Sequence, residues 1–387
     1  MRREGSPFQL AWSQLGRDRM RFAVAVAGVT FAVVLMLVQL GFQRALFRSA
    51  VRIQERLNGQ VVLISPQSSY IVQMRSFPRR RLEQALATPG VAAVSPLYMS
   101  LAFWENPETG QPRHIFLLGI DPEGDVLDMP DLRAQSGLLK LGDVALFDTA
   151  SRPEYGRVAE RVAKDGRLDV ELNDHRMEVR GVFQMGTSFG IDGTVVTSDL
   201  DFLRVSPQRQ PGLVDIGLVR LAPGASAESV RDAIARRVPN DVLVLTKEEY
   251  IQREIDYWNK VSPIGVVFGF GVMIGFGVGA IIVSQILFSD VSDHLPEYAT
   301  LKAIGYGNLY LYGVVLSQAI ILAVLGYLPG LLTALAIYHA AAKATMLPMT
   351  LAPEIVALVF ALTLSMCCLA GFLALRKLQR ADPAEIF

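Results

Sequence analysis

The chain has 387 residues, with 37 basic and 37 acidic side chains and a hydrophobic share of 51%. This balanced charge gives no support for nucleic-acid binding, because proteins that bind nucleic acids present strongly basic surfaces. The only two cysteines, Cys367 and Cys368, are adjacent and cannot form an unstrained disulfide with each other, so the fold must hold without one.

Four windows of the sequence contain no Asp, Glu, Lys or Arg, and each has at least 21 residues. A helix rises about 1.5 Å per residue and the hydrocarbon layer is about 30 Å thick, so each window is long enough to span a membrane. The windows are 22–42, 264–288, 311–338 and 355–375. We therefore predict four transmembrane helices, with bounds 22–42, 263–288, 309–339 and 355–375.

Residues 1–21 precede the first window and mix apolar with polar and basic side chains. The apolar members recur at helical spacing, which predicts an amphipathic helix lying on the cytoplasmic surface of the membrane. Ser6 is placed to cap this helix, and Pro7 fits its first position. The apolar side of the predicted helix comprises Phe8, Ala11, Trp12 and Leu15.

Basic residues flank the first and the last window. Four spans place both flanks on one side of the membrane, and the positive-inside tendency makes that side cytoplasmic, including a tail at 376–387. The first window is too long and begins too late for a cleaved signal peptide. The flanking residues are Arg2, Arg3, Arg17, Arg19 and Arg21 before the first window, and Arg376, Lys377 and Arg380 after the last.

Residues 43–262 form a large insert between the first two windows, long enough to bury a core of its own as a periplasmic domain. Two of its segments, 60–104 and 215–246, each predict a strand, a helix and a strand. Their spacing resembles paired ferredoxin-like half-units. Between about 105 and 212, short strand candidates separated by Gly, Asp and Pro predict a second, β-rich lobe.

Helical stalks are expected at both edges of this insert, over 43–58 and 247–260. The first stalk places Leu46, Ala50, Ile53 and Leu57 on one stripe, and the second places Tyr250, Ile251, Ile255 and Trp258 along a face. Arginines form another stripe of the first stalk. A solvated stalk face is the simpler interpretation of that stripe, and a lipid or nucleic-acid contact is the alternative. The arginines are Arg44, Arg48, Arg52 and Arg56.

The connector at 289–308 is a polar island between two apolar windows, and its pattern predicts a short helix. Asp293 is placed to cap this helix, Pro296 and Glu297 fall in its first turn, and Gly305 can end it in the left-handed conformation. A connector with its own helix indicates a surface that touches something. We interpret it as the contact with a separate motor, and the alternative is a loop on lipid headgroups. Its acidic balance favours a protein partner.

Glycines recur in the second window, with several separated by four residues. Small residues at that spacing let two helix backbones approach closely, so they predict packing against another span, here that of a second copy. In the third window, Pro329 predicts a kink that is either static or a moving hinge. A short periplasmic loop is expected at 340–354. The glycines assigned to dimer packing are Gly265, Gly269, Gly271, Gly275 and Gly279.

No motif for catalytic or metal chemistry appears in the sequence. There is no HExxH, no CxxC, no G-x-S-x-G elbow and no phosphate-binding G-x-x-x-x-G-K-[ST] loop. We therefore expect no catalytic residue, no metal and no cofactor on this chain. The windows also lack the charged relay that proton-driven transporters use. The histidines, none paired at metal-ligand spacing, are His114, His175, His294 and His339.

The connector and the C-terminal tail resemble those of the permeases of MacB/FtsX-like ABC transporters. That family's connector reads approximately REIGVLRALGA. Glu297, Leu301, Ala303 and Gly305 match this pattern, Lys302 and Ile304 match in type, and Pro296, Tyr298 and Ala299 depart from it. The tail Asp382-Pro383-Ala384-Glu385 also matches. By this resemblance the residues that couple to an ATPase are Glu297, Tyr298, Leu301, Lys302, Ile304 and Gly305.

The N-terminal segment LAWSQLGRDRMRFAVAVAGVTFAVVLMLVQLGF and the connector EYATLKAIGYGN further resemble the DevC-type permeases of cyanobacterial exporters. The resemblance implies a type VII ABC transporter permease, an α-helical membrane protein with four transmembrane helices plus a large α+β periplasmic domain of the MacB-like kind. It implies a homodimer in a bacterial, cyanobacterial inner membrane. The cargo it implies is a lipid or another amphiphile, including a heterocyst-envelope glycolipid.

The same resemblance implies partners. A DevA-like ABC ATPase subunit would hold ATP and Mg in the cytoplasm, a DevB-like membrane-fusion adaptor would lie in the periplasm, and a TolC-type outer-membrane channel would follow. Closure of the ATPases would push the 289–308 helices and move the periplasmic lobes through the stalks. The alternatives are a lipoprotein-releasing permease, an FtsX-like protein that signals to a cell-wall hydrolase, and a ligand-sensing membrane receptor.

Overall fold

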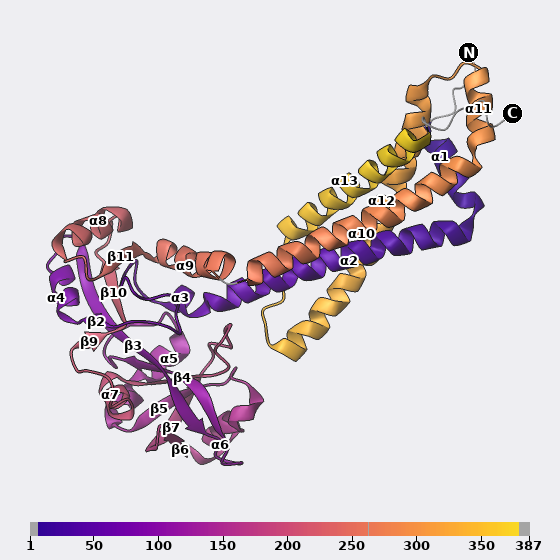
Figure 1. The fold of residues 1–387 in the computed structure, drawn as a ribbon. Helices are drawn as coiled ribbons and strands as arrows, with labels where there is room; N and C mark the ends of the chain where they lie inside the picture. The colour runs from indigo at the N-terminus through magenta and orange to yellow at the C-terminus, as the bar shows by residue number, and fades with distance from the viewer. Residues whose placement is uncertain (1–6, 262, 379–387) are drawn as a thin grey trace. The chain divides into compact units, whose positions relative to one another are not determined.

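The computed structural model describes residues 7–261 and 263–378. The chain divides into two compact units (Figure 1). The helical unit takes Met1–Ala45 and Pro263–Phe387, and the sheet unit takes Leu46–Ser262. The proposed cap Ser6 and the tail Asp382–Glu385 lie outside the described residues.

The helical unit is built around four long apolar helices. Among the described residues, four helices are long and apolar enough to cross a membrane, as the four charge-free windows predict. Each helix extends beyond its window because the polar and basic residues that flank the window continue the same helix. The helices of this unit are α1 (Pro7–Arg17), α2 (Arg19–Ala50), α10 (Ile264–Asp293), α11 (Leu295–Ala303), α12 (Asn308–Thr345) and α13 (Pro353–Leu378).

Glycines let α2 pack closely against α10 and α12. A Cβ atom built at Gly326 of α12 would lie 2.5 Å from the side chain of Val29 in α2, and one at Gly330 would lie 2.7 Å from Val33. These short separations show that the two backbones approach where only glycine fits. Thr30 strengthens the same crossing by donating a 3.0 Å hydrogen bond to the Gly326 carbonyl.

The glycine ladder of α10 is used mostly inside the chain, which differs from the expected packing against a second copy. A Cβ at Gly271 would meet Gln39 of α2, one at Gly275 would meet Leu35 and Met36 of α2, and one at Gly279 would meet Ala32 of α2 and Met366 of α13. A Cβ at Gly269 would meet open space, and Gly265 is half-buried in the first turn of α10. Three of the five glycines whose spacing predicts a dimer seam, Gly271, Gly275 and Gly279, therefore pack inside this chain's own bundle.

A nine-stranded mixed sheet forms the sheet unit, in the order β11-β1-β10-β3-β4-β8-β5-β7-β6. The strands are β1 (Val61–Ile64), β3 (Val91–Glu105), β4 (Pro112–Ile120), β5 (Val144–Asp148), β6 (Leu168–Leu172), β7 (His175–Phe183), β8 (Thr194–Ser198), β10 (Ile216–Leu221) and β11 (Leu243–Thr246), with β2 (Phe77–Pro78) and β9 (Leu213–Val214) paired separately. The helices are α3 (Arg52–Arg56), α4 (Arg80–Leu86), α5 (Pro130–Gln135), α6 (Val158–Asp165), α7 (Asp199–Val205), α8 (Ala227–Arg237) and α9 (Lys247–Asp256).

The two strand–helix–strand segments come together as the sequence predicts. Strands β11, β1, β10 and β3 are neighbours and antiparallel throughout, and α4 and α8 belong to the two crossovers. This order, with each half-unit contributing one inner and one outer strand, is that of a ferredoxin-like sheet. The chain leaves this region after β3 and returns to it at β10 (Figure 1).

The β-rich second region shares its sheet with the first. Strand β3 pairs with β10 through residues 91–97 and with β4 through residues 97–105. At its far end, Trp104 pairs with Leu172 of β6, which closes β3-β4-β8-β5-β7-β6 into a barrel-like ring. The two expected lobes are therefore joined by one continuous strand.

Each face of the sheet carries its own hydrophobic core because successive side chains of a strand point to opposite faces. In β1, Leu63 belongs to one core and Ile64 to the other, and in β4, Leu117 and Leu118 divide in the same way. Helices α4, α6, α7 and α8 contribute to the first core, and α3, α5 and α9 contribute to the second.

The first predicted stalk is interrupted. Helix α2 ends at Ala50, and α3 begins at Arg52 after a single turn residue. The arginine stripe is not uniformly solvated, which corrects the simpler interpretation: Arg48 and Arg56 are exposed, whereas Arg52 is half-buried against Gly186. The second stalk, α9, begins with a capping box between Thr246 and Glu249 and continues as a π-helical turn over Tyr257–Val261.

Candidate motor-coupling site

The connector between α10 and α12 folds as the helix α11 (Leu295–Ala303), with Pro296 and Glu297 in its first turn. The expected cap is wrong in detail. Asp293 is the last residue of α10, and His294 occupies the N-cap position of α11 without a side-chain cap hydrogen bond. Proline at the start of a helix needs no such cap, because its missing N–H would be unsatisfied there anyway.

Helix α11 ends as the sequence predicts. Gly305 has a φ of 105°, and the Tyr306 amide donates to the Leu301 carbonyl at 3.1 Å while the Gly305 amide donates to the Lys302 carbonyl at 3.0 Å. This pair of bonds is a Schellman motif, which requires a residue with positive φ after the helix. The chain therefore turns sharply at Gly305 and enters α12 at Asn308.

The predicted coupling residues divide between two sides of α11. Tyr298 is 4% exposed, and Leu301 packs against the core of the helical unit. Glu297 faces α1 through two hydrogen bonds. Lys302 is exposed, and Ile304 is 63% exposed immediately after the helix. One side therefore holds α11 to the bundle, and the other is open to a partner.

Gln14 of α1 is the centre of a hydrogen-bond network that fixes α11. Its side-chain carbonyl accepts from the Tyr298 hydroxyl and from Gln318 Nε2, both at 3.2 Å. Its amide group donates to Glu297 Oε2 at 3.2 Å. Gln318 Nε2 also donates to Asp290 Oδ2 at 2.7 Å. The network therefore links α1, α10, α11 and α12.

This network is buried, so losing one of its hydrogen bonds costs stability. Gln318 is fully buried, Gln14 is 5% exposed and Asp290 is 7% exposed. A buried polar group left without a partner costs about 1–3 kcal/mol, so each member depends on the others. Burial raises the pKa of the Tyr298 hydroxyl far above its ordinary value, so this residue remains a neutral donor. His294 adds a 2.8 Å contact from Nδ1 to the Asp290 backbone carbonyl.

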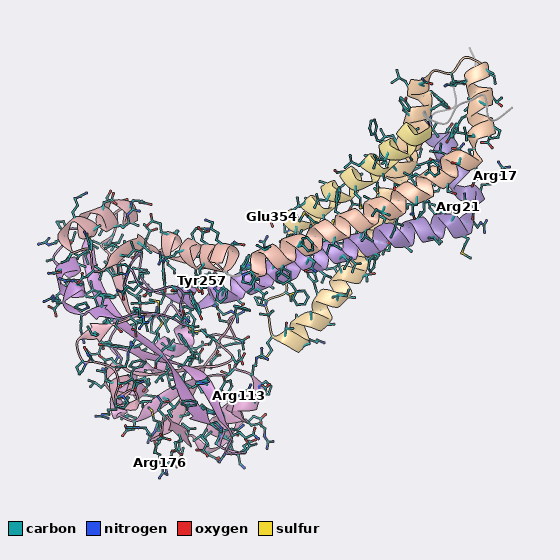
Figure 2. All side chains as sticks on the ribbon, viewed as in Figure 1. Arg17, Arg21, Arg113, Arg176, Tyr257 and Glu354 are labelled. Carbon is teal, nitrogen blue, oxygen red and sulfur yellow. The ribbon has the colours of Figure 1, made fainter. Side chains whose placement is uncertain are left out.

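A charged rim surrounds the buried network. Arg17 donates to Glu297 Oε1 at 3.2 Å, and Arg21 pairs with Asp293. Figure 2 shows Arg17 and Arg21 at the same end of the helical unit. These pairs are largely exposed, so each contributes no more than about 1 kcal/mol. The Arg17 pair helps to orient α1 against α11, and the Arg21 pair joins the start of α2 to the end of α10.

Helix α1 is therefore more than a helix on the membrane surface. Ala11 and Leu15, assigned by sequence to its apolar face, are buried in the core of the helical unit. Phe8 and Trp12, assigned to the same face, are more than half exposed. The expected single apolar face is split, because the bundle covers only the stripe that carries Ala11, Gln14 and Leu15.

The sheet unit contains two buried carboxyl groups where its stalks meet its loops. Asp148 is fully buried and accepts hydrogen bonds from the amides of Ala150, Met185 and Gly186. Burial raises its pKa, while those amides and the nearby Arg52 oppose the shift. The Ser188 hydroxyl donates to the Ser49 carbonyl at 2.6 Å, which ties the end of α2 to the same loop.

The second buried carboxyl group is Glu254 of α9. It accepts from the Ile71 amide at 3.1 Å and from Trp258 Nε1 at 3.0 Å, and burial raises its pKa to about 7. Trp258 belongs to a group of aromatic rings that also includes Tyr70, Tyr257 and Phe189. These contacts fix α9 and its π-helical turn against two loops of the sheet unit.

The sequence predicts α11 and three of the residues that hold it, Glu297, Tyr298 and Leu301, but it does not point to Gln14 or Asp290. A glutamine in a basic amphipathic helix and an aspartate in a polar connector both indicate solvent exposure, whereas the structure buries both side chains. The spacing of Ala11, Gln14 and Leu15 was the available signal, since it places all three on one helical stripe. Over the described ranges, no group of three or more metal-ligating side chains gathers.

Comparison with protein families identifies the chain. A family model for the MacB-like periplasmic core domain matches residues 22–237, more than half of the chain. The chain belongs to the MacB-like family of ABC transporter permeases. A model for the FtsX-like permease C-terminal region matches residues 267–383, which include α11 and the last two spans. No curated protein matches the chain.

Two solved structures are similar to part of this MacB-like permease. The extracellular domain of the noncanonic ABC-type transporter YknZ from Gram-positive bacteria is 15% identical, covers 48% of this chain and 99% of its own, and has a TM-score of 0.33. The periplasmic region of MacB from Actinobacillus actinomycetemcomitans is 10% identical, covers 52% of this chain and 94% of its own, and has a TM-score of 0.34.

Family membership assigns the two units their places. The sheet unit is a MacB-like periplasmic core domain, and the protein is an inner-membrane permease of the MacB/FtsX-like kind. Domains of these families are typically non-catalytic transport components, and their permeases work with an ABC ATPase and often with an adaptor.

Proposed function

We propose that this permease is driven through α11 by a separate ABC ATPase subunit, which holds ATP and Mg while the permease itself binds no cofactor and hydrolyses nothing. The division of α11 into two sides supports the proposal. Its inner side is fixed by Tyr298, Glu297 and Gln14, whereas Lys302 and Ile304 are exposed. A helix that is fixed to the bundle on one side and exposed on the other is suited to bind a partner and to transmit its movement to the spans.

A pair of substitutions on the exposed side of α11 tests this assignment. Lys302→Glu together with Ile304→Asp changes charge and polarity there without touching the buried network. We expect about tenfold weaker binding of the cognate ATPase, which corresponds to about 1.4 kcal/mol, and a matching loss of permease-stimulated ATPase activity. Lys343→Glu, at an exposed lysine near the other end of α12, is the matched control. Unaltered binding by the α11 variant would exclude this side of α11 as the ATPase contact.

We further propose that the protein exports a lipid or another amphiphile, including a glycolipid, as the DevC-type permease of a tripartite pump. A DevB-like adaptor would receive the cargo from the periplasmic core domain and pass it to a TolC-type channel. The resemblance of the N-terminal segment and the connector to cyanobacterial exporters supports this cargo class and a cyanobacterial source. Co-purification tests it: an ATPase with an adaptor supports export, whereas an ATPase with a hydrolase activator supports signalling instead.

We infer that the working form is a homodimer with both termini in the cytoplasm. The basic flanks of the first and last spans support that orientation. Pairing through α2 and α10 is compatible with exposed apolar residues on both helices, among them Phe31, Phe270 and Met273. Cysteine crosslinking between copies at position 270 tests the pairing, and labelling of Lys302 from the periplasmic side would refute the orientation.

A further inference from the structure

Gln14 is the described residue of α1 whose side chain hydrogen-bonds to both α11 and α12. Its amide side chain bonds α11 through Tyr298 and Glu297, and it bonds α12 through Gln318. Helix α11 continues directly from α10, so any motion of α11 reaches that span through the chain itself. The next span, α12, follows α11 only after the turn at Gly305, which lacks a side chain to stiffen it.

We propose that Gln14 is a positioning residue that couples α11 to α12, so that a push on α11 moves the third span together with the second. The inference rests on the proposed role of α11 as the ATPase contact. Helix α1 then connects α11 and α12, the two helices on either side of the turn at Gly305.

The chemistry of the site calls for an amide at position 14. The carbonyl oxygen accepts two hydrogen bonds from different helices, while the amide nitrogen donates to the Glu297 carboxylate. A glutamate would accept the same two bonds but would place a negative charge beside Glu297. A leucine of similar size would accept and donate nothing, and would leave the Tyr298 hydroxyl without its acceptor. Only a side chain that both accepts and donates satisfies the three partners.

Among the described residues, Gln14 links the body of α11 directly to α12 through hydrogen bonds, whereas the bond from Gln318 to Asp290 links α12 to α10. The buried Tyr298 hydroxyl donates to the Gln14 side-chain carbonyl, and Gln318 of α12 donates to the same oxygen. The Gln14 carbonyl thus connects Tyr298 to α12. Gln318 in turn holds Asp290, so the route closes on α10. Replacing Gln14 therefore removes the hydrogen bonds that join α11 to α12, while the bond from Gln318 to Asp290 and the apolar packing of each helix stay in place.

The test uses the full chain with its cognate ATPase in lipid nanodiscs. Spin labels at Leu316 of α12 and Phe372 of α13, both exposed, report the distance between these helices after Cys367 and Cys368 are replaced by alanine. In the parent protein we expect this distance to change between the nucleotide-free and the ATP–vanadate state. In Gln14→Leu we expect the ATP-driven population shift to fall about fivefold or more, as is usual for loss of coupling between sites.

Controls separate coupling from folding and from ATPase docking. Gln9→Leu makes the same substitution at an exposed position of α1 and should behave as the parent. Tyr298→Phe removes one donor while keeping the ring, so it should reduce the shift in part even if Gln14→Leu fails to fold. For all variants, thermal stability and ATPase affinity are measured in parallel, and we expect affinity to stay at the parental value.

Each outcome bears on a defined claim. Failure of the ATPase to bind the parent would overturn the proposed function and this inference together. Normal binding with an undiminished α12 shift in Gln14→Leu and Tyr298→Phe would overturn the inference alone. Loss of the shift in proportion to loss of thermal stability would assign Gln14 to folding and also overturn it.

Discussion

Replacing Glu254 by glutamine should change how the stability of the periplasmic core domain depends on pH. Glu254 is 2% exposed, and burial raises the pKa of its carboxyl group from 4.5 to about 7. The folded state therefore favours the protonated form. The stability that this group contributes is fully present below pH 4.5 and is lost as the pH rises through about 7.

The expected change in unfolding free energy follows from the pKa shift of Glu254. At about 1.4 kcal/mol per pKa unit, the parent should lose about 3 kcal/mol of unfolding free energy across this window. For a domain of this length, about 2–4 °C of Tm accompany each kcal/mol, so the Tm should fall by roughly 6–12 °C on this account. The glutamine of the variant is neutral at every pH, so this loss should be absent from it. Its amide has nearly the size of the carboxyl group and can still accept a hydrogen bond from the Ile71 amide.

Intrinsic tryptophan fluorescence during heating provides the measurement, because Trp104 and Trp258 both lie in the periplasmic core domain. Glu254→Gln should match the parent near pH 4.5 and be more stable than it near pH 8. Glu248→Gln, at an exposed position of the same helix, should keep the parental pH profile. The reasoning is refuted if Glu254→Gln loses as much Tm as the parent between these two pH values.

Two further substitutions test the packing described above. Asp148→Ala leaves two buried amides and one half-buried amide without an acceptor, so the periplasmic core domain should lose about 3 kcal/mol or more in unfolding free energy. The same fluorescence transition measures this loss, and a Tm within about 2 °C of the parent would contradict the role of Asp148. Gly326→Leu forces a side chain into Val29 of α2 and should lower the thermal stability of the helical unit in detergent by about 1–3 kcal/mol. Gly277→Leu, where a Cβ meets open space, is its control, and equal losses in both would show that close packing of α2 and α12 is not the cause.

The spans, α11 and the ferredoxin-like half-units could be predicted from the sequence because each has a strong local signal. A charge-free run of membrane length is rare in the core of a soluble protein, and the pattern of Pro296 before Gly305 marks the start and end of a short helix. The strand–helix–strand segments have the same local character. The sequence also shows that the second of these segments follows the first after a long insert, which predicts that the chain returns to pair the two segments in one sheet.

The network at Gln14 and the sharing of β3 could not be predicted, because both depend on partners far away in the sequence. Nothing near Gln14 indicates that Gln318, 304 residues away, will donate to it. The glycines of α10 show the same limit. Their spacing predicts close helix packing, but it cannot say whether the neighbour is α2 of the same chain or a span of another copy.

Strand β3 joins the two regions of the periplasmic core domain through a single continuous backbone. Its 15 residues hydrogen-bond to β10 along the first half and to β4 along the second, and the two ladders meet at Leu97. Both hydrophobic cores also extend across this junction, because each contains residues of the ferredoxin-like strands and of the barrel-like ring. Displacement applied at the ferredoxin-like end is therefore transmitted to the ring through one strand and the side chains packed on its two faces.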